Sequence, residues 1–245
     1  MLTKPRIIEL LLITTVPTMV LAQGGWPDTW LVILTVLGGA LAAGGANAIN
    51  MYIDRDIDHL MERTKNRPLV TGRVSPRNAL IFAVTLEVLA FVVLAASSNV
   101  LAGMLAISAT LFYVFVYSLW LKRTSRQNIV IGGAAGAAPV LVGWAAVTNN
   151  VSWSAVVLFL VIFLWTPPHF WALAIRHVDE YRAASVPMLP VVETLERTVR
   201  TMGLYAVAVA LASFALIPLN DMGVIYIATS LVSGVAFVAM TFRLG

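Results

Sequence analysis

Long apolar stretches separated by short polar segments run through the whole chain. A run of about 20 apolar residues is long enough to cross a bilayer as a helix. Segments of strictly alternating apolar and polar positions, the pattern of membrane β-strands, do not occur. We therefore predict an all-α protein, a polytopic membrane helical bundle with eight transmembrane helices. They cover approximately residues 7–23, 30–51, 79–97, 99–119, 129–147, 153–175, 199–219 and 222–242.

The composition agrees with a membrane protein. Of the 245 residues, 60% are hydrophobic and 11% are charged, and the mean hydropathy is +0.88. Ordinary soluble domains contain about 25% charged residues. The chain has no Cys, which excludes disulfides and thiolate metal ligands.

The positions of Lys and Arg orient the predicted helices. These residues lie at Lys4 and Arg6, within 55–77, 122–126 and 176–200, and at Arg243. With eight spans, all of these positions fall on one side, and the opposite connections contain no Lys or Arg. The positive-inside rule then predicts a multi-pass protein of the cell membrane with its N-terminus and basic loops in the cytoplasm. The net charge of +4 needs no nucleic acid to explain it.

The first 22 residues also have features of a secretion signal: a basic start, an apolar middle and a small residue, Ala22, at a suitable cleavage position. Glu9 and Pro17 interrupt the apolar part and argue against a signal. We therefore predict that this segment is a retained first helix.

The segment that follows the second predicted helix carries the candidate chemistry. Asn50, Asp54 and Asp58 are spaced by four residues, so a continued helix would place them on one face. Oxygen ligands of this kind suit Mg²⁺, which proteins usually share with substrate phosphates. Basic residues that can bind phosphate oxygens follow at once. The sequence predicts a metal site of Asn50, Asp54 and Asp58 beside diphosphate-binding Arg63, Lys65 and Arg67.

The alternative is a solvated loop whose acids and bases merely balance. Asn47, Asn50 and Tyr52 favour a functional site, because polar groups at the end of a membrane helix are costly unless they line a cavity. Lys122 and Arg123 follow the fourth predicted helix. They suit simple anchoring at the membrane surface, but they could also reach a diphosphate bound near the first loop.

A second long loop, 176–198, also begins with acids, Asp179 and Glu180. Its similarity to the first loop suggests one membrane domain, 1–245, built from two weakly related helical halves of about 1–125 and 126–245. Two unrelated loops would explain the same pattern.

The sixth predicted helix contains Trp165-Thr-Pro-Pro-His-Phe-Trp171. The two prolines remove backbone donors, so we expect the helix to kink or open there. His169 is the only histidine inside a predicted span. An imidazole in this position can ligate a haem iron, and a hydrogen-bonded structural histidine is the alternative.

These motifs together resemble a known family. Asn50-Met-Tyr-Ile-Asp54-Arg-Asp-Ile-Asp58 is similar to the signature of the UbiA-type intramembrane prenyltransferases, in particular their haem-farnesylating branch. The similarity continues over nearly the whole chain. It includes Tyr117-Ser118, Leu121-Lys-Arg-Thr124, Trp165 to Trp171, and Val186-Pro-Met-Leu-Pro190.

The resemblance implies a bundle of nine helices around a central cavity that opens to the cytoplasmic side. Since eight helices are predicted here, a ninth is expected beyond residue 245. Aromatic-ring prenyltransferases of the family carry a second pair of acids four residues apart. Here Ala183 stands four residues after Asp179, so Asp179 is not expected to bind the metal directly.

The resemblance also implies a reaction, in which the farnesyl group of farnesyl diphosphate is transferred to a vinyl group of haem b (protohaem IX). Water addition then gives haem O, which is used in terminal oxidase cofactor synthesis. Mg²⁺ is the implied cofactor, and Asn50, Asp54 and Asp58 match the family's catalytic metal-binding positions. A haem A synthase or an oxidase assembly protein is the implied partner.

Other functions stay open from the residues. A related prenyltransferase could act on a quinone precursor, another aromatic acceptor or a chlorophyll-type alcohol. A transporter or assembly factor is disfavoured because the acids lie at a helix end, whereas transporters usually place essential charges near mid-membrane. A lipid-alcohol phosphotransferase is disfavoured because no Asp-Gly-x-x-Ala-Arg element precedes the aspartates.

Overall fold

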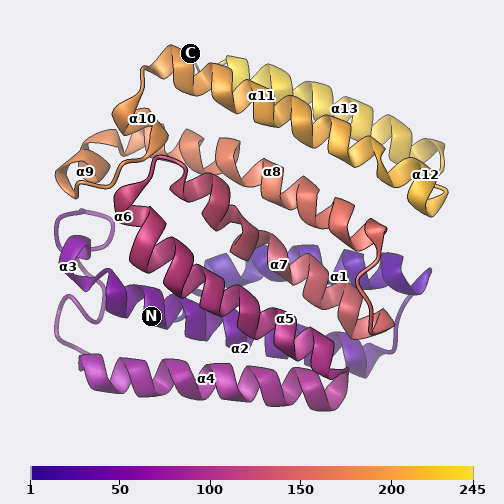
Figure 1. The fold of residues 1–245 in the computed structure, drawn as a ribbon, viewed down its shortest axis with the longest axis horizontal. Coiled ribbons are helices and arrows are strands. Elements are labelled where there is room, and N and C mark those ends of the chain that lie inside the picture. Colours follow the sequence, from indigo (N-terminus) through magenta and orange to yellow (C-terminus); the bar gives the residue numbers. More distant parts are fainter. Residues whose placement is uncertain (1, 245) are drawn as a thin grey trace. The chain divides into compact units, whose positions relative to one another are not determined.

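The structure is a computed structural model that describes residues 2–244, with side chains except those of residues 5–7, 10 and 11. Over these residues it contains helices and loops and no strand (Figure 1), which confirms the all-α prediction. The helices are α1 (Pro5–Gln23), α2 (Thr29–Ile53), α3 (Arg55–Asp58), α4 (Pro76–Ser97), α5 (Val100–Leu111), the π-helix η1 (Phe112–Leu121), α6 (Lys122–Thr124), α7 (Asn128–Thr148), α8 (Trp153–Arg176), α9 (Val178–Ala183), α10 (Leu189–Val192), α11 (Leu195–Phe214), α12 (Leu216–Asn220) and α13 (Val224–Phe242).

Seven helical segments of the described chain are long and apolar enough to cross a membrane. They match seven of the eight predicted spans, and the protein is a multi-pass membrane protein. The remaining predicted span, 7–23, coincides with α1, in which Leu12–Gln23 forms a shorter apolar helix. The total of eight therefore stays a prediction.

Polar side chains in the loops determine where several helices begin. Asp28 accepts a hydrogen bond from the Leu31 amide at 2.9 Å, and Ser75 accepts one from the Asn78 amide at 3.2 Å. Such caps satisfy backbone N–H groups that the first helical turn leaves without partners. Asn99, Ser152 and Thr194 cap α5, α8 and α11 in the same way.

The helices form two compact units. The first contains residues up to Trp120 together with Ala138–Val151. In this unit α2 packs along α4, and α4 packs against α5. Small side chains make this close packing possible, as is common between membrane helices. The buried cluster consists of Ala42, Ala90, Leu94, Ala102, Ala106, Val142, Ala145 and Ala146.

The second unit contains Leu121–Ala137 and the residues from Ser152 onward. Here α11 packs against both α8 and α13. The helix α8 runs continuously through Pro167 and Pro168. The expected opening is therefore wrong, and the expected kink stays a prediction. The prolines remove two backbone donors from a helix of 24 residues.

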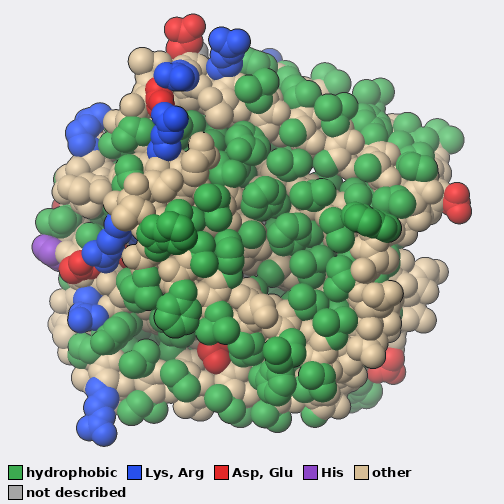
Figure 2. All heavy atoms as spheres, in the orientation of Figure 1, with side chains coloured by type: hydrophobic (Ala, Val, Ile, Leu, Met, Phe, Trp, Pro, Cys, Tyr) green, Lys and Arg blue, Asp and Glu red, His purple; other side chains and the backbone are tan. Residues whose placement is uncertain are grey.

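The outer side chains suit a lipid environment. Figure 2 shows hydrophobic side chains over most of the face drawn. On α4, for example, Ile81 and Val88 are 55% and 57% exposed. Exposed apolar surface on this scale is unfavourable in water and is expected where a helix faces acyl chains.

Candidate metal and diphosphate site

The predicted metal ligands meet where α2 ends. This helix stops at Ile53, and Asp54 links it to the short helix α3 with φ −84° and ψ 1°. The Asp54 amide still donates to the Asn50 carbonyl, and the Asp58 amide donates to the Asp54 carbonyl, both at 2.9 Å. The spacing of four residues therefore keeps its helical geometry across a junction, although the helix is interrupted rather than continuous.

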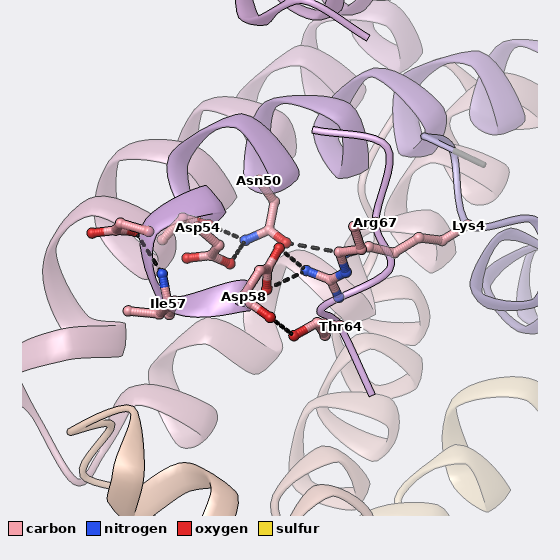
Figure 3. A network of polar contacts seen from close by, with 9 residues as sticks. Lys4, Asn50, Asp54, Ile57, Asp58, Thr64 and Arg67 are labelled. Atoms are coloured by element: carbon pink, nitrogen blue, oxygen red, sulfur yellow. Dashed lines mark hydrogen bonds and ion pairs between the residues drawn. The ribbon is translucent and has the colours of Figure 1, made fainter. Parts of the chain in front are cut away.

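The side chain of Asn50 links this segment to the π-helix η1. Its Nδ2 donates to Asp54 Oδ2 at 2.7 Å, as Figure 3 shows. The same Nδ2 also donates to Ser118 Oγ at 3.1 Å. All three side chains are buried. The π-helix has a wider turn than an α-helix, and such segments are frequent at functional sites. Ser118 is therefore a member of the site that the spacing of acids could not reveal.

The Asp58 carboxylate is neutralised by Arg67. Nη1 of Arg67 lies 2.7 Å from Oδ1 and 2.6 Å from Oδ2 of Asp58, as Figure 3 shows. Asp58 is only 2% exposed. Thr64 fixes the same stretch by donating its hydroxyl to the Asp58 carbonyl at 2.7 Å. The predicted metal ligand and the predicted diphosphate ligand are thus in direct contact.

Apolar packing holds the loop that carries Arg67. Met51 of α2, Leu69 of the loop and Ala79 of α4 form a buried cluster. Backbone bonds within the loop, including Arg67 N to Thr64 O at 2.9 Å, give it a compact turn structure. The guanidinium is therefore placed by the fold of the loop as well as by its ion pair.

A second cation approaches from the N-terminal segment. Lys4 Nζ donates to Asn50 Oδ1 at 3.0 Å, and Figure 3 shows its side chain extending toward Asn50. The two buried aspartates are accordingly accompanied by two cations, Lys4 and Arg67. In the sequence, 46 residues separate Lys4 from Asn50, so the position of Lys4 indicates only the orientation of the chain in the membrane.

The remaining predicted bases have other surroundings. Arg63 and Lys65 are exposed, and Lys65 pairs with Glu62 at 2.8 Å. Lys122 and Arg123 lie in α6, in the second unit. Among the loop bases, Arg67 contacts Asp58. The diphosphate roles of the others stay predictions.

Aromatic side chains also lie near the acids. Tyr113 and Tyr117 of η1 stack with their ring centroids 5.3 Å apart. Tyr113 is within electrostatic range of Asp54, Asp58 and Arg67. The first unit thus combines two carboxylates, two cations and a stacked aromatic pair in one region.

The second unit contains the other predicted residues. The ring of His169 stacks on Trp165 at 4.2 Å and meets the edge of Phe170 at 5.6 Å. It is exposed on α8. Asp179 is exposed and pairs with Arg182 at 2.6 Å, whereas Glu180 turns toward His177 at 3.0 Å. Of the two neighbouring acids, Glu180 is the more buried.

Among the residues that the structure describes, no group of three His, Cys, Asp or Glu side chains could hold a metal. Asparagine is not one of these four residue types, and the set of Asn50, Asp54 and Asp58 contains two carboxylates and one amide oxygen. Carboxylate and carbonyl oxygens are nevertheless typical ligands of Mg²⁺.

Comparison with known proteins identifies the family. Residues 11–244 match the model of the UbiA prenyltransferase family. A protein named protoheme IX farnesyltransferase from Clavibacter michiganensis subsp. michiganensis is 54% identical, over 99% of this chain and 79% of its own length. A protein of the same name from Kineococcus radiotolerans is also 54% identical, over 99% of this chain and 72% of its own length.

Solved structures show the same fold at lower identity. A digeranylgeranylglyceryl phosphate synthase has a TM-score of 0.79 and 19% identity, over 99% of this chain and 85% of its own. A UbiA homolog from Archaeoglobus fulgidus bound to DMAPP and Mg²⁺ has a TM-score of 0.75 and 19% identity, over 99% of this chain and 85% of its own. On the family model, the relatives and the fold together, this chain belongs to the UbiA prenyltransferase family.

Proposed function

We propose that this protein transfers the farnesyl group of farnesyl diphosphate to a vinyl group of haem b and, with addition of water, produces haem O. The observation that carries this proposal is the buried set of Asn50, Asp54 and Asp58 with its two cations. It occurs in a chain that is 54% identical, over 99% of its length, to proteins named protoheme IX farnesyltransferase.

The donor set of this site fits Mg²⁺. Asp54 and Asp58 are 0% and 2% exposed, and buried carboxylates require cationic partners. Arg67 and Lys4 already bind oxygen atoms of Asp58 and Asn50, so this region stabilises positive charge. We assign Asn50, Asp54 and Asp58 as the residues that would hold the metal. When bound, Mg²⁺ would neutralise charge that develops on the departing diphosphate.

The basic residues assist the same step from the protein side. The bond between farnesyl C1 and the diphosphate oxygen breaks, and its electron pair leaves with the diphosphate. Arg67, which contacts Asp58, would donate charge-assisted hydrogen bonds to that leaving group. We assign Arg63, Lys65, Lys122 and Arg123 as further diphosphate-binding residues, on the basis of their positions in the motifs.

The acceptor completes the reaction. The terminal carbon of a haem vinyl group forms the new bond to farnesyl C1, which leaves a cation beside the porphyrin. Water adds to this cation and loses a proton, giving a hydroxyl group. His169 is the proposed contact to the haem iron, since it stands on α8 between two aromatic rings that can pack against a porphyrin.

The proposed site faces the cytoplasm of the cell. This orientation follows from the concentration of Lys and Arg in the loops that carry the site. Farnesyl diphosphate is charged at one end and apolar at the other, so it would reach the site from the membrane surface with its diphosphate in the loops. The apolar chain would then remain among helices.

A product assay tests the proposal. Membranes that contain the wild-type protein, incubated with haem b, farnesyl diphosphate and Mg²⁺, should form haem O, detected by its mass. Asp54→Ala and Asp58→Ala should form none, whereas Arg73→Gln, at an exposed position of the same loop, should behave as wild type. Prenylation of a quinone precursor in place of haem b would refute the acceptor and support the alternative. Full activity of both Asp variants would refute the site.

A further inference from the structure

The N-terminal segment Leu2–Lys4 is fixed against the end of α2 by independent contacts. Asn47 Nδ2 donates to the Thr3 carbonyl at 3.2 Å. Leu2 packs on the cluster formed by Met51, Leu69 and Ala79. These contacts explain the polar Asn47 near the end of a membrane helix, because its amide binds the backbone of another segment.

Gly44 of α2 lies beside the same segment. A Cβ atom added at Gly44 would lie 3.3 Å from Thr3 Cγ2, which is closer than most packing contacts. The absence of a side chain at Gly44 therefore allows the segment to approach the helix. Together these contacts hold residues 2–4 where Lys4 can reach Asn50.

The backbone of Lys4 has an unusual conformation. Its φ of 51° and ψ of 65° lie in the left-handed region, and the helix α1 begins at the next residue, Pro5. For a residue other than glycine this conformation is sterically unfavourable. Such local strain persists only where surrounding contacts hold it, and it is frequent at functional sites. A lysine that only anchored the chain to headgroups would extend outward and would need no such conformation.

The ammonium group occupies a specific position in the site. It lies 3.0 Å from Asn50 Oδ1, while Nδ2 of the same amide donates to Asp54 at 2.7 Å. Asn50 is therefore the common neighbour of a cation and of a buried carboxylate. Any ligand that brought a metal and phosphate oxygens to Asn50 and Asp54 would arrive next to Lys4. Lysine is a frequent phosphate ligand because its ammonium acts as a compact point charge.

We propose that Lys4 is a diphosphate-binding residue of this site, delivered by the folded N-terminal segment, and that its ammonium moves from Asn50 Oδ1 to a diphosphate oxygen when the prenyl diphosphate binds. The exchange would leave the Asn50 oxygen available to a bound metal, while the ammonium would neutralise the diphosphate. This inference rests on the proposed function, because it concerns the same diphosphate.

A binding experiment tests the inference directly. The chain has no Cys, so Lys4→Cys introduces a single thiol. Reaction of that thiol with 2-bromoethylamine gives a cationic side chain of nearly the length of lysine, whereas iodoacetamide gives a neutral one. Binding of farnesyl thiodiphosphate with Mg²⁺, which does not require turnover, is measured by calorimetry for each form.

We expect Lys4→Cys to bind the analogue about tenfold to a hundredfold more weakly than the wild type, as for loss of one charge-assisted hydrogen bond. Aminoethylation should restore most of the affinity, and carbamidomethylation should not. Arg73→Cys, treated with the same reagents, removes a charge from an exposed loop position and should bind as the wild type does in every form. Equal affinity of Lys4→Cys and wild type would overturn the inference.

A second measurement uses the wild-type protein and does not depend on the folding of a variant. Reductive methylation of lysines, quantified by mass spectrometry, should modify Lys4 more slowly when the analogue and Mg²⁺ are present. Unchanged modification of Lys4 at saturating analogue would also overturn the inference. If the proposed function itself is wrong, the wild type forms no haem O. If only the role of Lys4 is wrong, wild type and Lys4→Met form haem O with the same KM for farnesyl diphosphate.

Discussion

Asp58 and Arg67 form an ion pair in which one guanidinium nitrogen lies 2.6 and 2.7 Å from the two carboxylate oxygens. The Asp58 side chain is 3% exposed and that of Arg67 is 17% exposed. The pair therefore joins the end of α3 to the following loop in a region with little water. In this arrangement Arg67 provides positive charge that a bound metal could also supply to Asp58.

The first prediction concerns stability without ligands. Arg67→Met should lower the free energy of unfolding by about 3 kcal/mol, because it leaves a buried carboxylate without its partner. Asp58→Asn combined with Arg67→Met should recover most of this loss, since the remaining side chain is neutral. Thermal denaturation in detergent measures both effects. Lys65→Met, which breaks an exposed pair with Glu62, serves as the control and should cost about 0.5 kcal/mol or less. A melting temperature of Arg67→Met equal to that of the wild type would contradict the prediction.

The second prediction concerns Ser118. Ser118→Ala removes the hydroxyl that accepts a hydrogen bond from Asn50 Nδ2. The Asn50 amide group is then held less firmly with its oxygen toward the site. We expect about a fivefold increase in the Mg²⁺ concentration needed for half-maximal activity, corresponding to the loss of one hydrogen bond of about 1 kcal/mol. A magnesium titration of the haem O assay measures this. Ser97→Ala, whose hydroxyl donates to a backbone carbonyl of α4, should leave the titration unchanged. An unshifted curve for Ser118→Ala would mean that this contact is only structural.

Several elements of the fold and the site follow from the sequence for identifiable reasons. The spans are recognisable because apolar length is a local property. The contact of Asn50 with Asp54 follows from a spacing of four residues, which is also local. The charge pattern likewise identifies the loops that contain the acids.

Other elements could not be predicted because they depend on contacts between distant segments. Lys4 and Ser118 reach Asn50 from 46 and 68 residues away. The π-helix η1 was predicted as the end of an ordinary helix, because apolar residues such as Phe112 and Leu121 satisfy either helical form. Arg63, Lys65 and Arg67 have similar chemistry in the sequence, and the packing of Leu69 helps to determine that Arg67 contacts Asp58.

The third prediction concerns the acceptor side of the reaction. His169→Ala should weaken the binding of haem b at least tenfold and change the visible spectrum of the bound haem, because a nitrogen ligand to iron is lost. Its affinity for farnesyl thiodiphosphate should not change, since the diphosphate residues remain. Spectroscopic titration with haem b measures the first quantity. His177→Ala is the matched control, because this histidine pairs with Glu180 on the helix α9. Identical spectra for His169→Ala and wild type would exclude iron ligation by His169.

The fourth prediction concerns Gly45 and Glu87, which form a close contact between α2 and α4. Thr110 of α5 donates to Glu87 Oε1 at 3.2 Å, and a Cβ added at Gly45 would lie only 2.5 Å from that same oxygen. Gly45→Ala should therefore lower the free energy of unfolding by about 1–3 kcal/mol, as for other overpacked interiors.

Glu87→Ala should suppress most of the effect of Gly45→Ala, because it removes the side-chain atoms closest to the new methyl group and leaves only the Ala83 carbonyl oxygen at 3.0 Å. The double variant should melt above Gly45→Ala alone. This result would identify steric exclusion, since general damage to α2 would give additive losses. Gly136→Ala is the control, because a Cβ there has no neighbour within 4 Å, and its melting temperature should stay near that of the wild type. Additive losses in the double variant would show that Glu87 is not what requires glycine at position 45.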